Sequence, residues 1–212
     1  MKMKDYRNYH EVDIKSKIES DGNLLFEKAL NGFEGKDVLI NSSPTRVIVT
    51  SKFNNEEGTI KYILAKRNEI YRGSTIDHEE SKWLITSLPH DNGFYKKAEM
   101  KLCNNNFVLQ AAGIREIENG RDKYGMPIFE TIVTPEVSLP CIVDTTVSTS
   151  GDSEPIRLPE NQLNITIPYT NHENLNLNHE FMMYETKYKV IGFDKTHSIN
   201  GIGLLIIKAE RV

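Results

Sequence analysis

Cysteine is scarce in this chain of 212 residues, which has only Cys103 and Cys141. A disulfide-stabilised scaffold needs more cysteines, and a structural zinc site needs closely spaced pairs, so neither is expected. Each cysteine lies in an apolar stretch, which predicts two reduced thiols that are buried as small hydrophobic groups. Reduced thiols indicate a protein that folds in a cytosol.

Long hydrophobic runs and a strong charge of one sign are also missing. The longest apolar run, residues 202–207, is far too short to cross a bilayer, and the charged N-terminus lacks the apolar segment of a secretory signal. With a net charge of −4, the chain as a whole lacks the excess of positive charge that is typical of nucleic-acid-binding proteins, although a local basic patch is compatible with this value. We therefore expect a soluble globular protein without a membrane partner.

Catalytic motifs are absent as well. The chain has no Gly-x-Ser-x-Gly elbow, phosphate-binding loop, dinucleotide-binding fingerprint or recognisable Cys-His pair. The aromatic residues alternate with aliphatic ones, which is typical of a core and not of the aromatic-plus-basic surface that binds single-stranded nucleic acid. We expect no enzymatic activity, no cofactor and no metal site.

Two clusters of ionisable residues are nevertheless candidates for chemistry. His172 and His179 lie seven residues apart in an Asn-rich segment, whereas a zincin needs two His four apart on one helical turn. Asp77 to Glu80 is an acidic stretch in which we expect a solvated hairpin turn. A metal-dependent hydrolase that uses His172 and His179 is one alternative from another class, and a single-strand nucleic-acid binder is a second.

A short repeat is the most informative feature that the sequence does contain. Residues 80–86 (Glu-Ser-Lys-Trp-Leu-Ile-Thr) and 185–191 (Glu-Thr-Lys-Tyr-Lys-Val-Ile) share two identical and three similar positions. Each copy is followed by an Asn-Gly turn and then by a last extended run. This pattern predicts a duplicated β-module with Trp83 and Tyr188 in equivalent cores, although chance similarity between two amphipathic strands would also produce it.

The remaining pattern is almost entirely of the two-residue period that indicates strands. We predict strands at 46–51, 60–65, 82–86, 95–103, 107–112, 128–133, 139–143, 163–167, 185–193 and 202–209. Helical spacing occurs only between Asp21 and Phe33, after a charged arm formed by residues 1–20.

The predicted fold is therefore mainly β. It consists of two tandem small antiparallel β-barrel or sandwich modules, residues 35–105 and 106–212, which follow an arm and a short amphipathic helix within residues 1–34. Two polar segments, 113–127 and 145–160, are predicted to be long loops of the second module.

The first of these loops contains the candidate site residues. Arg115, Arg121, Lys123 and Tyr124 combine positive charge with one aromatic ring in a Gly-rich segment. Long loops on compact β-modules often carry function, so we expect a protein interface at these residues. A mobile polar loop without a partner is the alternative.

Several segments resemble the neck and connector proteins of tailed bacteriophages that infect Gram-positive hosts. The resemblance lies in Tyr71-Arg-Gly-Ser-Thr-Ile, Ser81-Lys-Trp-Leu-Ile, Tyr95-Lys-Lys-Ala and Leu102-Cys-Asn-Asn. The closing hairpin from Lys187 and the opening segment from Leu25 are similar as well. The second module is a departure from the smallest head-closure proteins of this group, which leaves the exact position in the neck open.

This resemblance implies a structural subunit of the virion that performs no chemistry. It implies a homo-oligomeric ring at the head–tail interface, which is assembled in the host cytoplasm and joins portal or adaptor proteins to tail proteins, with a possible contact to packaged DNA. The arm at 1–20 and the loops at 113–127 and 145–160 are the candidate linkers, by strand addition to a neighbour. Another tail or baseplate protein built from similar barrels is the alternative.

Overall fold

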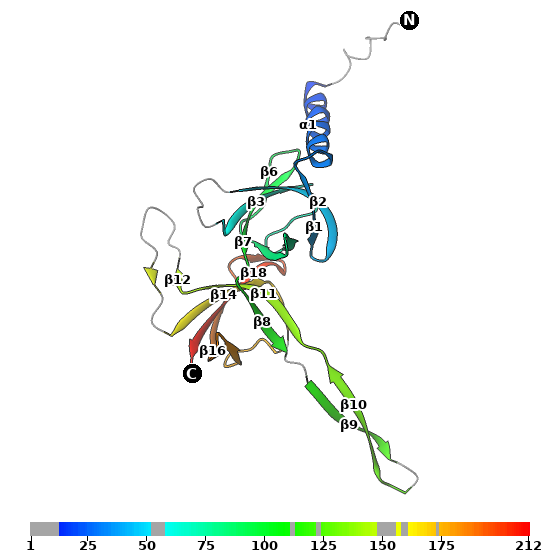
Figure 1. Cartoon of the computed structure of the whole chain (residues 1–212), viewed down its shortest axis with the longest axis vertical. Coiled ribbons are helices and arrows are strands. Elements are labelled where there is room, and N and C mark those ends of the chain that lie inside the picture. Colours follow the sequence, from blue (N-terminus) through cyan, green and yellow to red (C-terminus); the bar gives the residue numbers. More distant parts are fainter. Residues whose placement is uncertain are drawn as a thin grey trace, which may run out of the picture. The chain divides into compact units, whose positions relative to one another are not determined.

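The chain forms two compact units, Met1–Leu102 (unit 1) and Cys103–Val212 (unit 2), shown in Figure 1. The computed structural model describes residues 13–51, 58–110, 113–121, 124–147, 156–157, 161–172 and 174–212. Within these ranges, no helix is both long enough and apolar enough to cross a membrane.

Unit 1 consists of one helix and one closed antiparallel sheet. Its elements are α1 (Ile14–Asn31), β1 (Gly35–Ile40), β2 (Ser43–Ser51), β3 (Ile60–Ala65), β4 (Thr75–His78), β5 (Ser81–Ile85), β6 (His90–Asp91) and β7 (Lys96–Leu102). The strand order is β3-β2-β1-β4-β5-β7-β6, and an additional pairing of β3 with β7 closes the sheet into a barrel. Alternate residues such as Ile63 and Met100, both fully buried, fill its core.

Helix α1 begins at Ile14, so the predicted start at Asp21 and the predicted arm over residues 1–20 are corrected. Residues Asp13–Ser20 are all exposed, so this part of the helix adds no buried side chain to the core. Further along, Phe26 and Leu30 are buried against Ile48 of β2 and supply the helical period. Residues 1–12 of the predicted arm lie outside the described residues.

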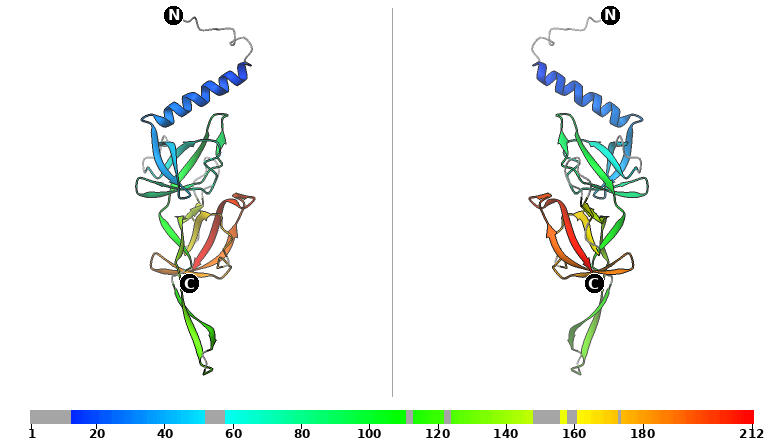
Figure 2. Two further views of the ribbon diagram at one scale, coloured as in Figure 1. Left: turned by 90° about the vertical axis from the view of Figure 1, so that its right-hand side faces the viewer. Right: turned by 90° about the vertical axis from the view of Figure 1, so that its left-hand side faces the viewer.

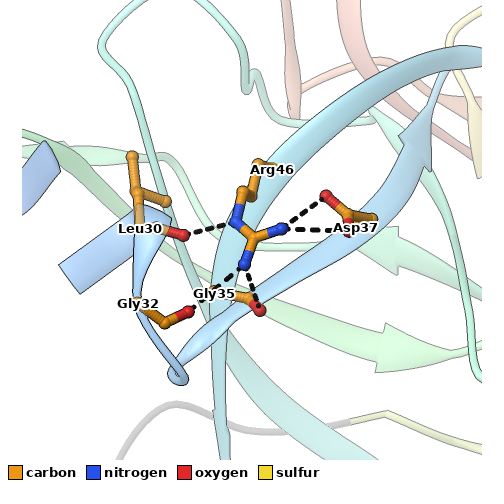
Figure 3. Close-up of polar contacts among 5 residues, drawn as sticks. All are labelled: Leu30, Gly32, Gly35, Asp37 and Arg46. Carbon is orange, nitrogen blue, oxygen red and sulfur yellow. Dashed lines mark hydrogen bonds and ion pairs between the residues drawn. The ribbon is translucent and has the colours of Figure 1, made fainter. Parts of the chain in front are cut away.

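Arg46 of β2 holds the end of α1 on the barrel (Figure 3). Its Nε–H donates to the carbonyl of Leu30, and Nη2 donates to the carbonyls of Gly32 and Gly35 at 3.2 and 3.4 Å. Nη1 binds the Asp37 carboxylate at 3.0 and 3.1 Å. These bonds satisfy the carbonyl groups of Leu30, Gly32 and Gly35, at the helix end and just beyond it. The carbonyl of Leu30 has no hydrogen-bond partner within its own helix.

Unit 2 contains the remaining strands. They are β8 (Asn105–Gln110), β9 (Gly113–Arg121), β10 (Pro127–Thr134), β11 (Val137–Asp144), β12 (Thr146–Val147), β13 (Ile156–Arg157), β14 (Gln162–Pro168), β15 (Glu180–Met183), β16 (Thr186–Asp194), β17 (Ser198–Ile199) and β18 (Ile202–Arg211). Its main sheet has the order β15-β16-β18-β14-β11-β8, while β9–β10 and β12–β13 form separate pairs. As predicted, Leu163, Ile165 and Ile167 of β14 all point into the core.

The two units repeat one pattern of strand pairing, which confirms the predicted fold class of two tandem β-barrel-like sheets. The corresponding strands, in chain order, are β1 and β8, β2 and β11, β3 and β14, β4 and β15, β5 and β16, β6 and β17, and β7 and β18. Every pairing within the second series has a counterpart in the first. Within the described residues, the one pairing that unit 2 lacks is the counterpart of β1 with β4.

The short sequence repeat falls at equivalent places in the two units. Glu80 and Glu185 both have φ +59°, and each is the last residue of the tight turn before β5 or β16. Trp83 lies opposite Ile76 and is buried in its core, as predicted. Tyr188 lies opposite Phe181, with ring centroids 6.1 Å apart, and is only half-buried at the margin of the second core. Tyr188 therefore does not fill that core as Trp83 does.

Both predicted loops of the second module contain strands. The segment 113–127 includes all of β9, and the segment 145–160 includes β12 and β13. The residues between β12 and β13 and those at 158–160 lie outside the described part of the chain. Neither cysteine forms a disulfide: Cys141 is buried, which raises the pKa of its thiol to about 12, while Cys103 is half-buried. Burial was predicted for both cysteines and is observed for Cys141 alone.

Gly203 provides a test of the tight connection between β17 and β18. Its φ is +138°, and an added Cβ would collide with the carbonyl oxygen of His197 and lie 2.7 Å from Cα of Ser198. We expect Gly203→Ala to lower the free energy of unfolding of unit 2 by at least about 1 kcal/mol, measured by calorimetry. Gly192→Ala is the matched control, because nothing lies within 4 Å of its added Cβ. Equal stability of the two variants would contradict this description of the turn.

Candidate functional site

Arg115, Arg121 and Tyr124, three of the predicted interface residues, lie on a β-hairpin formed by β9 and β10, which has no counterpart in the described part of unit 1. Strands β1 and β2 are joined directly by Asn41 and Ser42, whose φ values are +48° and +68°. Their counterparts β8 and β11 are instead separated by residues 111–136, which contain the hairpin. The hairpin is thus an insertion into a duplicated core, and its two strands form a sheet of their own (Figure 2).

Backbone pairing gives the hairpin a defined register. Val133 lies opposite Ile114, Thr131 opposite Glu116 and Phe129 opposite Glu118. The register shifts between Pro127 and Phe129, which places a bulge near the turn. The sequence predicted a loop here because residues 115–121 are mostly charged or polar, a composition that also suits a strand with no core to cover.

Apolar side chains of the hairpin are exposed. Phe129 and Val133, on one face of β10, are 57% and 69% exposed, and Tyr124 and Met126 beside the turn are 79% and 66% exposed. Exposed apolar groups that gather on one element mark an interaction surface. An isolated two-stranded ribbon is also marginally stable in water, so a partner that covers this one would stabilise it.

The charged candidates occupy different parts of the hairpin. Arg121 is exposed at the end of β9, where its Nε lies 3.5 Å from the Glu118 carboxylate. Arg115 lies opposite Ile132 in the register, near the base of the hairpin. Tyr124 lies in the turn, and Lys123 lies outside the described residues. The structure therefore brings Arg121 and Tyr124 to the same end and places Arg115 at the other.

Sequence reasoning missed the apolar half of this surface. Phe129 and Val133 were expected in a strand with a core to cover, but β10 pairs with β9 alone. The available signal was the alternation of Phe129, Thr131 and Val133 beside a Gly-rich polar segment. That alternation fixes which residues share a face, but it does not reveal whether the face is covered.

The His-rich segment shows local contacts. The N–H of Asn174 donates to Nδ1 of His172 at 3.2 Å, and the ring of His179 stacks on Phe181 with centroids 6.4 Å apart. Glu173 lies outside the described residues. Among the residues that are described, no group of three or more His, Cys, Asp or Glu side chains is arranged to hold a metal ion.

Of the cluster at Asp77 to Glu80, only Glu79 and Glu80 form the predicted turn, whereas Asp77 and His78 belong to β4. His78 is buried, and the loss of its hydration lowers its pKa, while the nearby Glu79 opposes this shift. Lys61 donates to the Glu79 carboxylate at 3.2 Å and lies 4.8 Å from the centre of the Trp83 ring. These contacts tie the turn to Lys61 of β3 and Trp83 of β5.

Comparison with known proteins gives the family. The SPbeta prophage-derived protein YomX of Bacillus subtilis (strain 168) is 38% identical to this chain over 212 residues, with 98% of each chain covered. A solved structure of MrkH, described as a c-di-GMP dependence transcription regulatory factor, matches 92% of this chain and 83% of that chain at 12% identity. Its TM-score of 0.19 is too low to support any inference.

The family models divide the chain as its two units do. A model described as the YomX N-terminal domain matches residues 8–102, and one described as the YomX C-terminal domain matches residues 116–210. The prophage origin of the relative supports the predicted phage affiliation. The chain therefore belongs to the YomX family.

Proposed function

We propose that this protein is a non-enzymatic structural subunit of a phage particle. In this proposal it assembles as a ring in the neck, between the portal or adaptor proteins and the tail, and the β9–β10 hairpin binds a neighbouring subunit. The prophage origin of the relative and the resemblance of several segments to neck proteins support the proposal.

The observation that carries this proposal is that the hairpin adds exposed apolar residues to a unit whose core is complete without them. Unit 1 completes the same strand pattern with a two-residue turn at this place, so the insertion is not required for folding. Its exposed residues Phe129 and Val133 lie on one face of β10 and can be covered together.

The backbone of the hairpin offers a second means of attachment. Within the described residues, β9 and β10 pair only with each other, so no third strand pairs with either of them. Another extended segment can add to the edge of such a two-stranded sheet. Strand addition of this kind gives affinity through the main chain, while pockets for alternate side chains give specificity.

The position in the particle is tested by labelling. Antibody against this chain, applied to purified phage particles and imaged by negative-stain microscopy, should label the junction of head and tail. Labelling of the capsid shell or of the tail fibres alone would exclude the neck. Labelling along the tail or at the baseplate would favour the alternative virion part.

The role of the hairpin is tested by a double substitution, Phe129→Ser with Val133→Ser. Both side chains are exposed, so we expect the melting temperature to change little. Incorporation of the chain into particles, measured by quantitative immunoblotting, should fall at least about 5-fold, because loss of central apolar contacts typically weakens an interface by more than about 1 kcal/mol.

A matched control separates this effect from a general loss of surface apolarity. Leu177→Ser removes a side chain that is 58% exposed, against 57% for Phe129, and it lies in unit 2 outside the hairpin. The control should enter particles like the unmodified chain. Normal incorporation of the double variant would refute the role of the hairpin.

A further inference from the structure

Helix α1 uses one face to cover the β6–β7 hairpin of unit 1. The ring of Phe94 lies directly against Gly22, and the rings of Phe26 and Tyr95 stack with centroids 4.9 Å apart. Phe94 and Tyr95 both belong to the connection between β6 and β7. The tip of this hairpin is thus covered by an amphipathic helix.

The helix has a second apolar stripe that unit 1 does not cover. Ile14, Ile18 and Leu25 are 76%, 58% and 66% exposed. Their spacings of four and seven residues place them on one side of the helix, together with the exposed Asp21. The covered positions Phe26 and Leu30 lie on a different side, so α1 can contact two surfaces at once.

Unit 2 presents the counterpart of the covered hairpin without a helix over it. Strands β17 and β18 correspond to β6 and β7, and they are joined by Asn200 and Gly201, which have φ values of +50° and +78°. Ile199 and Ile202 lie opposite each other beside this turn and are 65% and 54% exposed. In the described part of the chain α1 is the one helix, and it is packed on unit 1.

We infer that the outer stripe of α1, formed by Ile14, Ile18 and Leu25, binds the β17–β18 tip of a second copy of this chain. The contact repeats, between copies, what α1 already does within unit 1. It joins two different surfaces, so it is heterologous and generates a ring where the rotation closes. The inference rests on the proposed function as a ring-forming subunit and names the surfaces that would form the ring.

Charge favours this partner over a second helix. Asp21 lies in the middle of the stripe, so antiparallel pairing of two α1 helices about that point would bring two carboxylates together. The loop before β17 instead presents Lys195 and His197, which are both exposed. The tip of a second copy therefore offers a positive group for Asp21 beside an apolar pair for Ile18 and Leu25.

A mixing experiment tests the inference with full-length chains. The helix variant carries Ile18→Ser and Leu25→Ser, and the tip variant carries Ile199→Ser and Ile202→Ser. All four side chains are more than half exposed, so folding should be retained, which circular dichroism and the melting temperature verify. Self-association is measured by sedimentation velocity over a range of concentrations.

Each variant alone should self-associate at least about 30-fold more weakly than the unmodified chain, the loss expected when an interface loses its central apolar contacts. An equimolar mixture of the two should recover a heterodimer and nothing larger, because one intact helix stripe and one intact tip remain in each mixed pair. Leu88→Ser, which removes a side chain 64% exposed on unit 1, should associate like the unmodified chain.

Other outcomes would overturn the contact. An unmodified chain that stays monomeric at every concentration, unchanged association of either variant, or a mixture that stays monomeric each contradicts it. Neck labelling with any of these results would leave the proposed function standing and remove only the helix–tip contact. Labelling elsewhere on the particle, together with a heterodimer in the mixture, would refute the neck position and leave the helix–tip contact standing.

Discussion

The burial of alternate strand residues inside each unit is the constraint on which the rest of the structure depends. Each sheet fills its own interior, with Ile63 and Met100 fully buried in unit 1 and Ile165 and Ile167 fully buried in unit 2. Neither core needs the β9–β10 hairpin or the outer side of α1. Apolar residues that remain exposed on those elements are the surfaces that we propose meet other subunits.

Duplication makes this reasoning possible, because each unit serves as a reference for the other. The direct β1–β2 turn shows that the hairpin of unit 2 is an addition. Helix α1 covers the β6–β7 tip, whereas Ile199 and Ile202 beside the β17–β18 tip are exposed. Arg46 fixes the end of α1 to its own barrel through three backbone carbonyls and Asp37. Arg46 therefore also fixes the position of the outer stripe of the helix, for which we infer a second contact.

Much of the fold could be predicted from the sequence, because inward-facing residues impose a period of two wherever a core is present. The strand from Ile60 to Ala65 was predicted with its bounds, and the repeat around Trp83 and Tyr188 indicated the duplication. The misses share one physical cause. The first turns of α1 have only Ile14 and Ile18 as apolar residues and the strand β9 is mostly polar, so neither shows the dense apolar period of an element that covers a core.

The candidate site was predicted only in part for the same reason. The charged and Gly-rich composition of the segment indicated Arg121 and Tyr124. The exposure of Phe129 depends on which elements pack beside it, and the local sequence pattern does not contain that information. A density map of the neck in assembled particles tests the central claim most directly. The account predicts a ring of two-barrel subunits between portal and tail, with Phe129 and Val133 buried against a neighbour. A neck without this chain, or a ring in which the hairpin lies in solvent, would contradict it.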